Sequence, residues 1–240
     1  MIYHHRLRTM PDVLDTAIDH SIPAPLPLNL TTPVAAPAAR KRPKPGERRI
    51  QILQALATML EQPGGERITT AALAARLCVS EAALYRHFAS KAQMFEGLIE
   101  FIEQTIFSLI NQITERDATG ANGAAGAGAR QAARVIGMLM QFAEKNPGMA
   151  RVMVGDALVF ENDRLIARMN QFFDKVEASL KQNLRDSASV DGSATPTVQA
   201  QVSASVLIAF VGGRLQRFVR SGYKRLPSEN LEASLRLMLG

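Results

Sequence analysis

The sequence predicts an all-α protein of about nine helices, with a small three-helix unit in front of a larger helical body. Apolar residues recur three and four residues apart through most of the chain after residue 46, which is helical spacing. Aromatic residues make up only 5% of the 240 residues and tryptophan is absent, which disfavours strands. A hydrophobic content of 47% and a charged content of 21% are ordinary for a globular chain.

The first 45 residues differ from the rest in composition. They hold eight of the twelve prolines and follow neither helical nor strand spacing. We interpret 1–45 as a disordered arm that ends in the basic run ARKRPKPGERR. The arm contains His4, His5 and His20, and we expect no metal site among them.

Three short helices are predicted next. The first ends at the PGG sequence of 63–65. Its apolar face comprises Ile50, Leu53, Ala57 and Leu60. The second begins at the capping residues Thr69 and Thr70 and ends near Leu77, and Ser80 caps the third. The apolar residues that would pack these helices against the first are Leu73, Ala74, Leu77, Val79, Leu84 and Phe88.

A long fourth helix is predicted to follow. Ser90 caps it, Gln93 fits a capping box, and the helix reaches about residue 115. Its core stripe comprises Met94, Leu98, Ile102, Ile106, Leu109 and Ile113. A helix of this length joins the small unit to the body.

Five further helices complete the prediction. Their ranges are 129–145, 148–155, 161–186, 197–222 and 228–238. A Gly/Ala-rich linker, 120–130, and a polar loop, 187–197, separate them. The linker's glycines do not spell G-x-G-x-x-G and follow no strand, so a dinucleotide-binding loop is excluded. Gly212 and Gly213 interrupt a helix, which either close approach of a second helix or a kink would explain. We therefore expect 161–186 and 197–222 to form a homodimer interface.

The residues suited to catalysis are few. Cys78 is the single cysteine, which excludes an intramolecular disulfide and a multi-cysteine metal site. Cys78 and His87 are the candidates for cysteine or histidine chemistry in the folded part, and we expect Cys78 inside a turn as a small apolar residue. Asp156, Glu161 and Asp163 are typical of a helix start rather than of an acid–base pair. We expect neither enzymatic activity nor a cofactor.

Targeting signals are not evident. No apolar stretch follows the charged first residues, so we expect no secretory signal. The uncharged runs 21–39 and 192–213 carry prolines or a polar opening, which argues against a spanning helix. These features predict a cytoplasmic protein with no membrane partner.

The net charge of +6 is concentrated in one segment. Residues 40–91 hold ten Lys or Arg against four acidic residues, and the remainder of the chain is nearly neutral. A basic block beside a neutral body suits phosphate binding, because release of counterions drives such binding. A solvated basic linker without a partner is the alternative.

The block 47–90 has the spacing of a helix-turn-helix, in which the second short helix begins at a capping serine. Ala82 and Ala83 are small enough for the helix to approach base edges, and Arg86 could reach guanine or a phosphate. Phosphate contacts are expected from side chains and from the free N–H groups of a helix N-terminus. The predicted DNA-contacting residues are Thr69, Thr70, Ser80, Ala82, Ala83, Tyr85, Arg86, His87 and Lys91.

The stretch RITTAALAARLCVSEAALYRHFASKAQMF resembles the N-terminal domain of TetR-type regulators, most visibly in LYRHF followed by Ser-Lys. The resemblance implies a helix-turn-helix DNA-binding domain over 46–91, a larger helical domain for dimerisation and partner binding over 92–240, and a homodimer. Cys78 departs from the family pattern, because the turn commonly carries glycine there.

Later stretches, FAEKNPGMARVMVGDALVFENDRL and RFVRSGYKRLP among them, resemble the nucleoid occlusion factors of this family. The resemblance implies a nucleoid-associated protein whose dimers bind chromosomal palindromes, with the number of dimers per site left open. It also implies binding of the C-terminal tail of the division GTPase FtsZ, which blocks septum assembly over the nucleoid. The tail would dock between the fourth and fifth helices, at Phe101, Lys145 and Asn146. Leu109 and Gln141 stand where that pattern has a basic residue and a glycine.

Alternatives exist for these residues and for the whole protein. Phe101 could pack in the core, and Lys145 and Asn146 could cap a helix before Pro147. The protein could instead be a ligand-responsive TetR-type repressor, although few polar residues in its C-terminal part are suited to hold a ligand.

Overall fold

The structure is a computed structural model that describes residues 46–62, 68–119, 126–190, 192 and 194–239, and the statements below concern these residues. Its elements in chain order are α1 (Glu47–Leu60), α2 (Thr70–Arg76), α3 (Glu81–Tyr85), α4 (Lys91–Thr119), α5 (Ala127–Lys145), α6 (Pro147–Met153), the 3-10 turn η1 (Asp156–Leu158), α7 (Asp163–Val190), α8 (Pro196–Arg220) and α9 (Leu231–Leu239). No strand occurs in this part of the chain, which confirms the all-α prediction.

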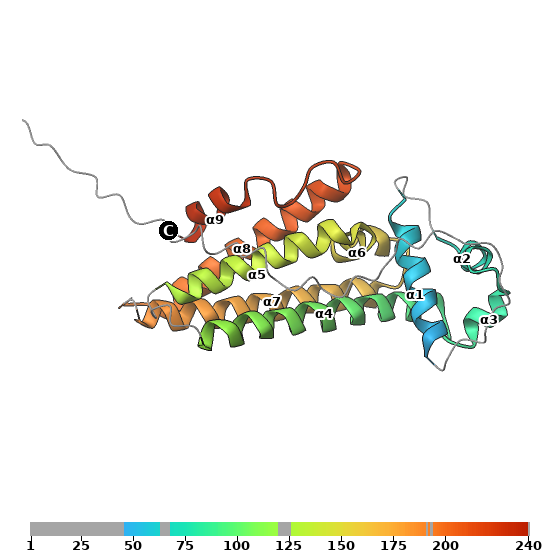
Figure 1. The fold of residues 1–240 in the computed structure, drawn as a ribbon, viewed down its shortest axis with the longest axis horizontal. Helices are drawn as coiled ribbons and strands as arrows, with labels where there is room; N and C mark the ends of the chain where they lie inside the picture. Colours follow the sequence, from blue (N-terminus) through green and yellow to red (C-terminus); the bar gives the residue numbers. More distant parts are fainter. Residues whose placement is uncertain (1–45, 63–67, 120–125, 191, 193, 240) are drawn as a thin grey trace, which may run out of the picture.

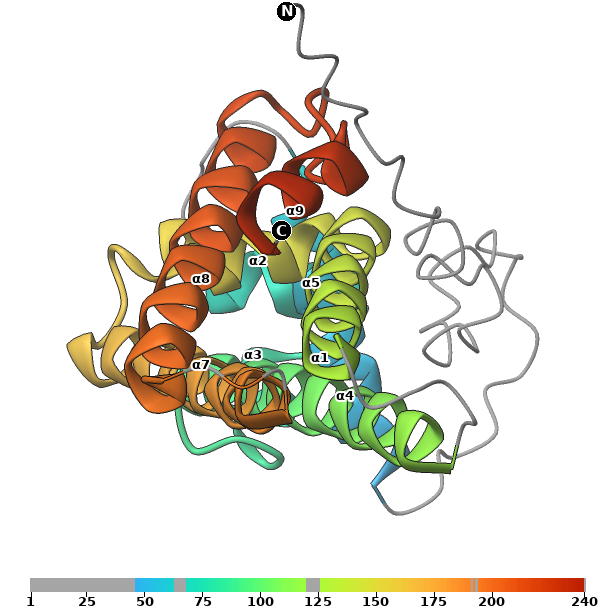
Figure 2. The same cartoon turned by 90° about the vertical axis from the view of Figure 1, so that its left-hand side faces the viewer.

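The helices form an elongated molecule in which α1, α2 and α3 lie at one end (Figure 1). The long helix α4 starts at that end and runs along the body beside α5 and α7. In the end-on view of Figure 2, α4 and α7 lie below α5 and α8, and α9 lies against both α5 and α8. One apolar core continues from the small unit into the body.

The long helix α4 has the predicted cap and core stripe. The Ser90 hydroxyl accepts a hydrogen bond from the Gln93 amide at 3.2 Å, and Gln93 Oε1 accepts one from the Ala89 amide at 2.8 Å. The predicted stripe is buried along its whole length, from Met94 to Ile113. The helix continues to Thr119, slightly beyond the predicted end.

The predicted apolar face of α1 is partly wrong. Ile50 is 53% exposed and Leu53 is only half-buried, whereas Ile52 and Leu56 are buried together with the predicted Ala57 and Leu60. The physical reason is that α1 packs against α2, α4 and α6, so a strip wider than one face becomes buried. The register that satisfies these neighbours cannot be read from α1 alone.

One predicted loop boundary needs correction, and three predicted segments lie outside the described residues. The predicted loop 187–197 begins late, because α7 continues to Val190. The Ser189 hydroxyl donates to the Arg185 carbonyl at 2.9 Å, a bond that lets serine remain helical. The predictions for the 1–45 arm, the PGG sequence and residues 120–125 lie outside the described residues.

By length and composition, α8 is long and apolar enough to cross a membrane. The sequence-based expectation for 192–213 missed this, because α8 starts within the polar opening, at Pro196, and extends beyond the run to Arg220. A single helix of this kind is weak evidence for a span. Helix α8 packs along α7 and exposes Val198, Val202 and Val206.

Candidate nucleic-acid interface and partner surface

The hydroxyl groups of the helix-turn-helix fix the ends of α2 and α3. Thr69 Oγ1 accepts a hydrogen bond from the Ala72 amide at 3.1 Å, and Ser80 Oγ accepts one from the Ala83 amide at 3.3 Å. Thr70 Oγ1 donates to Glu81 Oε2 at 2.5 Å, which joins the starts of the two helices. The two caps therefore define where α2 and α3 begin, and the Thr70–Glu81 hydrogen bond holds the two starts together in the free protein.

The surface of α3 separates cleanly into an inner and an outer face. Leu84 and Phe88 are buried, whereas Tyr85, Arg86 and His87 are exposed. Of the two alanines expected to approach base edges, Ala82 is exposed and Ala83 is half-buried. The outward side chains are thus small at the start of α3 and cationic or polar at its end.

Sequence reasoning counted Arg49 only as part of the basic block and missed its role in holding α3. The Arg49 guanidinium lies 4.2 Å from the centre of the Phe88 ring and donates to the His87 carbonyl at 3.2 Å. This contact ties the exposed start of α1 to the end of α3. An Arg followed 38 or 39 positions later by an aromatic residue carries no sequence signal, so the pairing could not be read from spacing.

Lys91 starts α4 beside the helix-turn-helix, but its amino group is already engaged. Nζ lies 2.5 Å from Glu161 Oε1, and both side chains are largely buried. Nζ also lies 5.6 Å from the centre of the Phe95 ring. In the free protein Lys91 therefore joins the start of α4 to the segment that precedes α7.

The Cys78 side chain is exposed, so the expectation that it lies inside the turn is wrong. Its φ is 52°, the left-handed conformation that glycine adopts without strain. The α2–α3 turn thus has the backbone geometry expected where the family commonly carries glycine, and the β-carbon points outward.

The three residues of the predicted partner surface differ in their surroundings. Phe101 on α4 is half-buried against the core, whereas Lys145 at the end of α5 is exposed. Asn146 Nδ2 donates to the Phe142 carbonyl at 2.8 Å, so this side chain also caps the end of α5. Leu109 is only 6% exposed, so its side chain belongs to the core. Helices α4 and α5 pack against each other, which brings Phe101 and Lys145 onto neighbouring elements.

A polar junction that the sequence did not reveal connects α1 to the body. The Leu60 carbonyl, at the end of α1, accepts hydrogen bonds from Arg151 Nη1 at 3.1 Å and from the Tyr223 hydroxyl at 3.2 Å. Arg151 is only 9% exposed, and its Nε lies 2.7 Å from Asp156 Oδ2. This junction fixes the small N-terminal unit on α6 and on the turn after α8.

Burial at this junction affects two ionisable groups. Desolvation raises the pKa of the Glu61 carboxyl, and the Arg76 guanidinium partly opposes that shift. Desolvation also raises the pKa of the Tyr223 hydroxyl, against the opposing effect of Arg151. Within the described ranges no cluster of three or more histidine, cysteine or acidic side chains could hold a metal ion.

Two family models match this chain, one over the N-terminal helices and one over the helical body. Residues 52–98 match the family model described as bacterial regulatory proteins of the tetR family, and residues 130–239 match the SlmA-like tetracyclin repressor-like C-terminal domain. The nucleoid occlusion factor SlmA of Idiomarina loihiensis is 48% identical over 191 residues, which is 80% of this chain and 93% of that protein. The chain belongs to the SlmA family of TetR-type regulators.

Further members of the SlmA family agree closely. The nucleoid occlusion factor SlmA of Vibrio cholerae is 49% identical over 186 residues, covering 77% of this chain and 90% of that protein. That of Aliivibrio fischeri is 48% identical over 189 residues, covering 78% and 92%. Family membership makes this chain a DNA-binding regulator rather than an enzyme, as the sequence predicted.

Solved structures support the TetR-like fold at low sequence identity. The fatty acid degradation regulator FadR of Bacillus halodurans superimposes with a TM-score of 0.64 at 14% identity, covering 83% of this chain and 97% of that one. FadR of Bacillus subtilis in complex with stearoyl-CoA gives 0.62 at 15% identity, covering 80% and 97%. These matches concern the arrangement of helices alone.

Proposed function

We propose that this protein is a nucleoid occlusion factor that binds chromosomal palindromes as a homodimer and, when bound to DNA, binds the FtsZ tail and blocks septum assembly over the nucleoid. The observation that carries the proposal is the similarity to SlmA at 48% identity over 191 residues, well beyond the helix-turn-helix. Such a protein acts at the nucleoid, in the cytoplasm.

DNA binding is assigned to the outer side of α2 and α3. Arg86 and the alanines Ala82 and Ala83 face bases, and Tyr85 and His87 meet phosphates. The exposed side chains at the end of α3 and the local excess of positive charge support this assignment. The full set is Thr69, Thr70, Ser80, Ala82, Ala83, Tyr85, Arg86, His87 and Lys91. Lys91 reaches phosphate by exchanging Glu161 for the DNA backbone.

The homodimer is assigned to α7 and α8. Val198, Val202 and Val206 follow one another at intervals of one helical turn and are exposed, opposite the buried face of α8 that carries Ala200, Ala204 and Leu207. Gly213 lies further along the same helix, is exposed, and has open space where a β-carbon would stand. An apolar stripe with a glycine suits close contact with a second copy, and two half-sites on one face of DNA require such a pair.

FtsZ tail binding is assigned to the neighbouring helices α4 and α5. Phe101 supplies an apolar anchor, and Lys145 and Asn146 supply a cation and an amide at the end of α5. The exposed Lys145 supports this role, because a rim cation on a docking surface steers an acidic peptide. The arrangement separates the DNA surface from the partner surface, so one protein can hold both.

Two titrations of the same variants test the proposal. Labelled palindromic duplex and labelled FtsZ tail peptide are titrated with the parent protein, Arg86→Ala and Lys145→Glu. We expect Arg86→Ala to weaken duplex binding by about 1–3 kcal/mol and Lys145→Glu to weaken tail binding alone. Failure of the DNA-bound parent to bind the tail would instead favour a ligand-responsive repressor.

A further inference from the structure

A second basic cluster lies at the end of α8 and in the turn that follows. Residues 214–225 contain five cationic side chains and no acidic one. Arg214 is engaged, since it donates to the Glu229 carbonyl and to the Ser234 hydroxyl. The other four, Arg217, Arg220, Lys224 and Arg225, make no side-chain hydrogen bond or ion pair with any residue that the structure describes.

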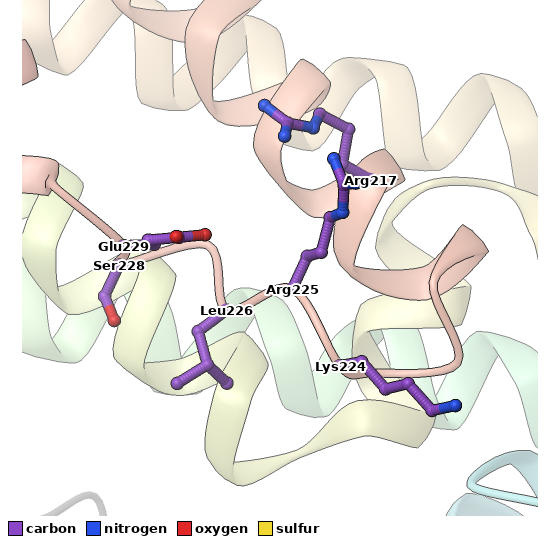
Figure 3. A pocket seen from close by; sticks show the side chains of 6 residues that line it. All are labelled: Arg217, Lys224, Arg225, Leu226, Ser228 and Glu229. Atoms are coloured by element: carbon purple, nitrogen blue, oxygen red, sulfur yellow. The ribbon is translucent and has the colours of Figure 1, made fainter.

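Three of these free cations line one open hollow of about 640 Å³. Figure 3 shows Arg217 on α8 and Arg225 on the turn, with Arg225 extending towards Arg217, and Glu229 on the opposite side of the hollow. Leu226 is 50% exposed and adds an apolar surface, and Ser228 lies beside Glu229. Cations gathered around one hollow raise the local positive potential and attract carboxylates.

The helix dipole does not account for the whole cluster. Arg217 and Arg220 lie in the last turn of α8, where a cation interacts favourably with the free carbonyl groups. Lys224 and Arg225 follow the end of the helix and lie beyond that effect, yet they line the same hollow. The interaction with the helix dipole therefore explains Arg217 and Arg220 but leaves Lys224 and Arg225 without a role in stabilising α8.

This hollow adjoins the end of α5. The Ser228 amide donates a hydrogen bond to Glu144 Oε1 at 2.9 Å, and Glu144 directly precedes Lys145. The basic turn and the proposed anchor for the FtsZ tail are thus joined through one hydrogen bond at the same helix end.

The surface of α4 near Phe101 lacks the charge that an acidic peptide requires. Glu100 is exposed next to Phe101, and Glu103 is held by Arg168 and Lys175 at 2.8 and 3.7 Å. Leu109 is buried where the family resemblance implies a basic residue. Lys145 is then the one cation of the proposed tail-binding set, so further positive charge has to come from another element.

We propose that the acidic tail docked at Phe101 and Lys145 continues over the end of α5 and places its carboxylates in the hollow formed by Arg217, Lys224 and Arg225. This proposal rests on the proposed function and enlarges its partner surface. The open shape and the half-exposed Leu226 fit an extended peptide that carries an apolar side chain beside its carboxylates.

The test is a titration of labelled FtsZ tail peptide, including its acidic residues, against the DNA-bound dimer. The variant Lys224→Glu/Arg225→Glu reverses two charges in the hollow. Arg236→Glu reverses one exposed charge on α9, outside the proposed dimer and tail contacts, and serves as the control. We expect the first to weaken tail binding about tenfold and to flatten its salt dependence, and the control to change it by less than about twofold. Equal effects of the two variants overturn the proposal while tail binding itself stands.

Two further measurements keep the result interpretable. Lys224→Gln/Arg225→Gln removes the cations without adding acid, and we expect a smaller loss in the same direction with an unchanged melting temperature. Duplex affinity is measured on all variants, and a loss of DNA binding equal to the loss of tail binding assigns the turn to DNA and overturns the proposal. If the parent binds no tail at all, the proposed function itself fails.

Discussion

Gly148 on α6 lies directly against the carbonyl oxygen of Ala57 on α1. A β-carbon at position 148 would stand 2.2 Å from that oxygen, far inside van der Waals contact. The acceptor belongs to a helix backbone and cannot rotate away, so α1 and α6 approach each other this closely only with glycine at this position.

Gly148→Ala should therefore destabilise the protein by about 1–3 kcal/mol, because one helix must shift to admit the methyl group. The matched control is Gly137→Ala on α5, where a β-carbon would meet nothing within 4 Å. That change should raise stability by about 0.5–1 kcal/mol through helix propensity. Urea unfolding of both variants gives the comparison, and equal effects of the two would contradict the close approach.

The two donors to the Leu60 carbonyl should show coupled effects. Tyr223→Phe removes one hydrogen bond and should cost about 1 kcal/mol, since Arg151 still satisfies the acceptor. Arg151→Met should cost about 1–3 kcal/mol, because Asp156 loses its partner as well. The double variant should lose more than the two single changes combined, because neither donor remains. If the stability losses of the two single variants simply add up to that of the double variant, the two hydrogen bonds stabilise the junction independently, and the expected coupling is absent.

Glu61 should give stability a pH dependence of predictable sign. Burial raises its pKa in the folded protein, so the charged form is disfavoured there. The favourable contribution of the Glu61 carboxyl to the free energy of unfolding is then fully present below the pKa of Glu61 in the unfolded chain. It is lost as the pH rises through the pKa of Glu61 in the folded protein. Glu61→Gln should accordingly be more stable than the parent at neutral pH, and the difference should vanish on acidification below about pH 4.5. Melting temperatures at a series of pH values measure this, and a variant less stable than the parent at neutral pH would refute it.

Lys91→Ala should weaken binding to all DNA sequences alike and lower the slope of log affinity against log salt by about 0.9, the share of one phosphate. Because Lys91 also pairs with Glu161, the variant should melt at a lower temperature too. Glu161→Gln is the control, since it disturbs the same ion pair and leaves the lysine charge in place. We expect that control to keep the parent's salt slope, and an unchanged slope for Lys91→Ala would remove Lys91 from the DNA surface.

Val202→Glu should convert the homodimer into a monomer, because it buries a charge in the proposed α8 contact. Leu237→Glu on α9 is the matched control, since that side chain is 89% exposed and outside the proposed contact. Sedimentation at micromolar concentration distinguishes the two species. A dimeric Val202→Glu variant would move the interface away from this face of α8.

The features that the sequence predicted well depend on local signals. Thr69, Ser80 and Ser90 were identified as caps because a capping hydroxyl acts within three residues of its partner. The stripe of α4 was found because a long helix repeats its pattern many times.

The features that the sequence did not reveal depend on contacts between distant segments. Packing against three neighbouring helices decides which face of α1, the one with Ile52, is buried. At the junction, Leu60 bonds to Arg151, 91 positions later in the sequence, and to Tyr223, 163 positions later. No periodicity encodes such pairings. The exposure of Cys78 was missed for a related reason, because residue type alone does not tell which way a β-carbon points in a left-handed turn.

The exposed Cys78 is a natural attachment site for a spectroscopic label. It is the single thiol of the chain and stands in the turn between α2 and α3. A spin label or fluorophore therefore attaches at one defined position per protomer without any substitution. In a dimer, the distance between the two labels measures the separation of the two helix-turn-helix units. That separation sets how far apart the half-sites on the bound DNA must be.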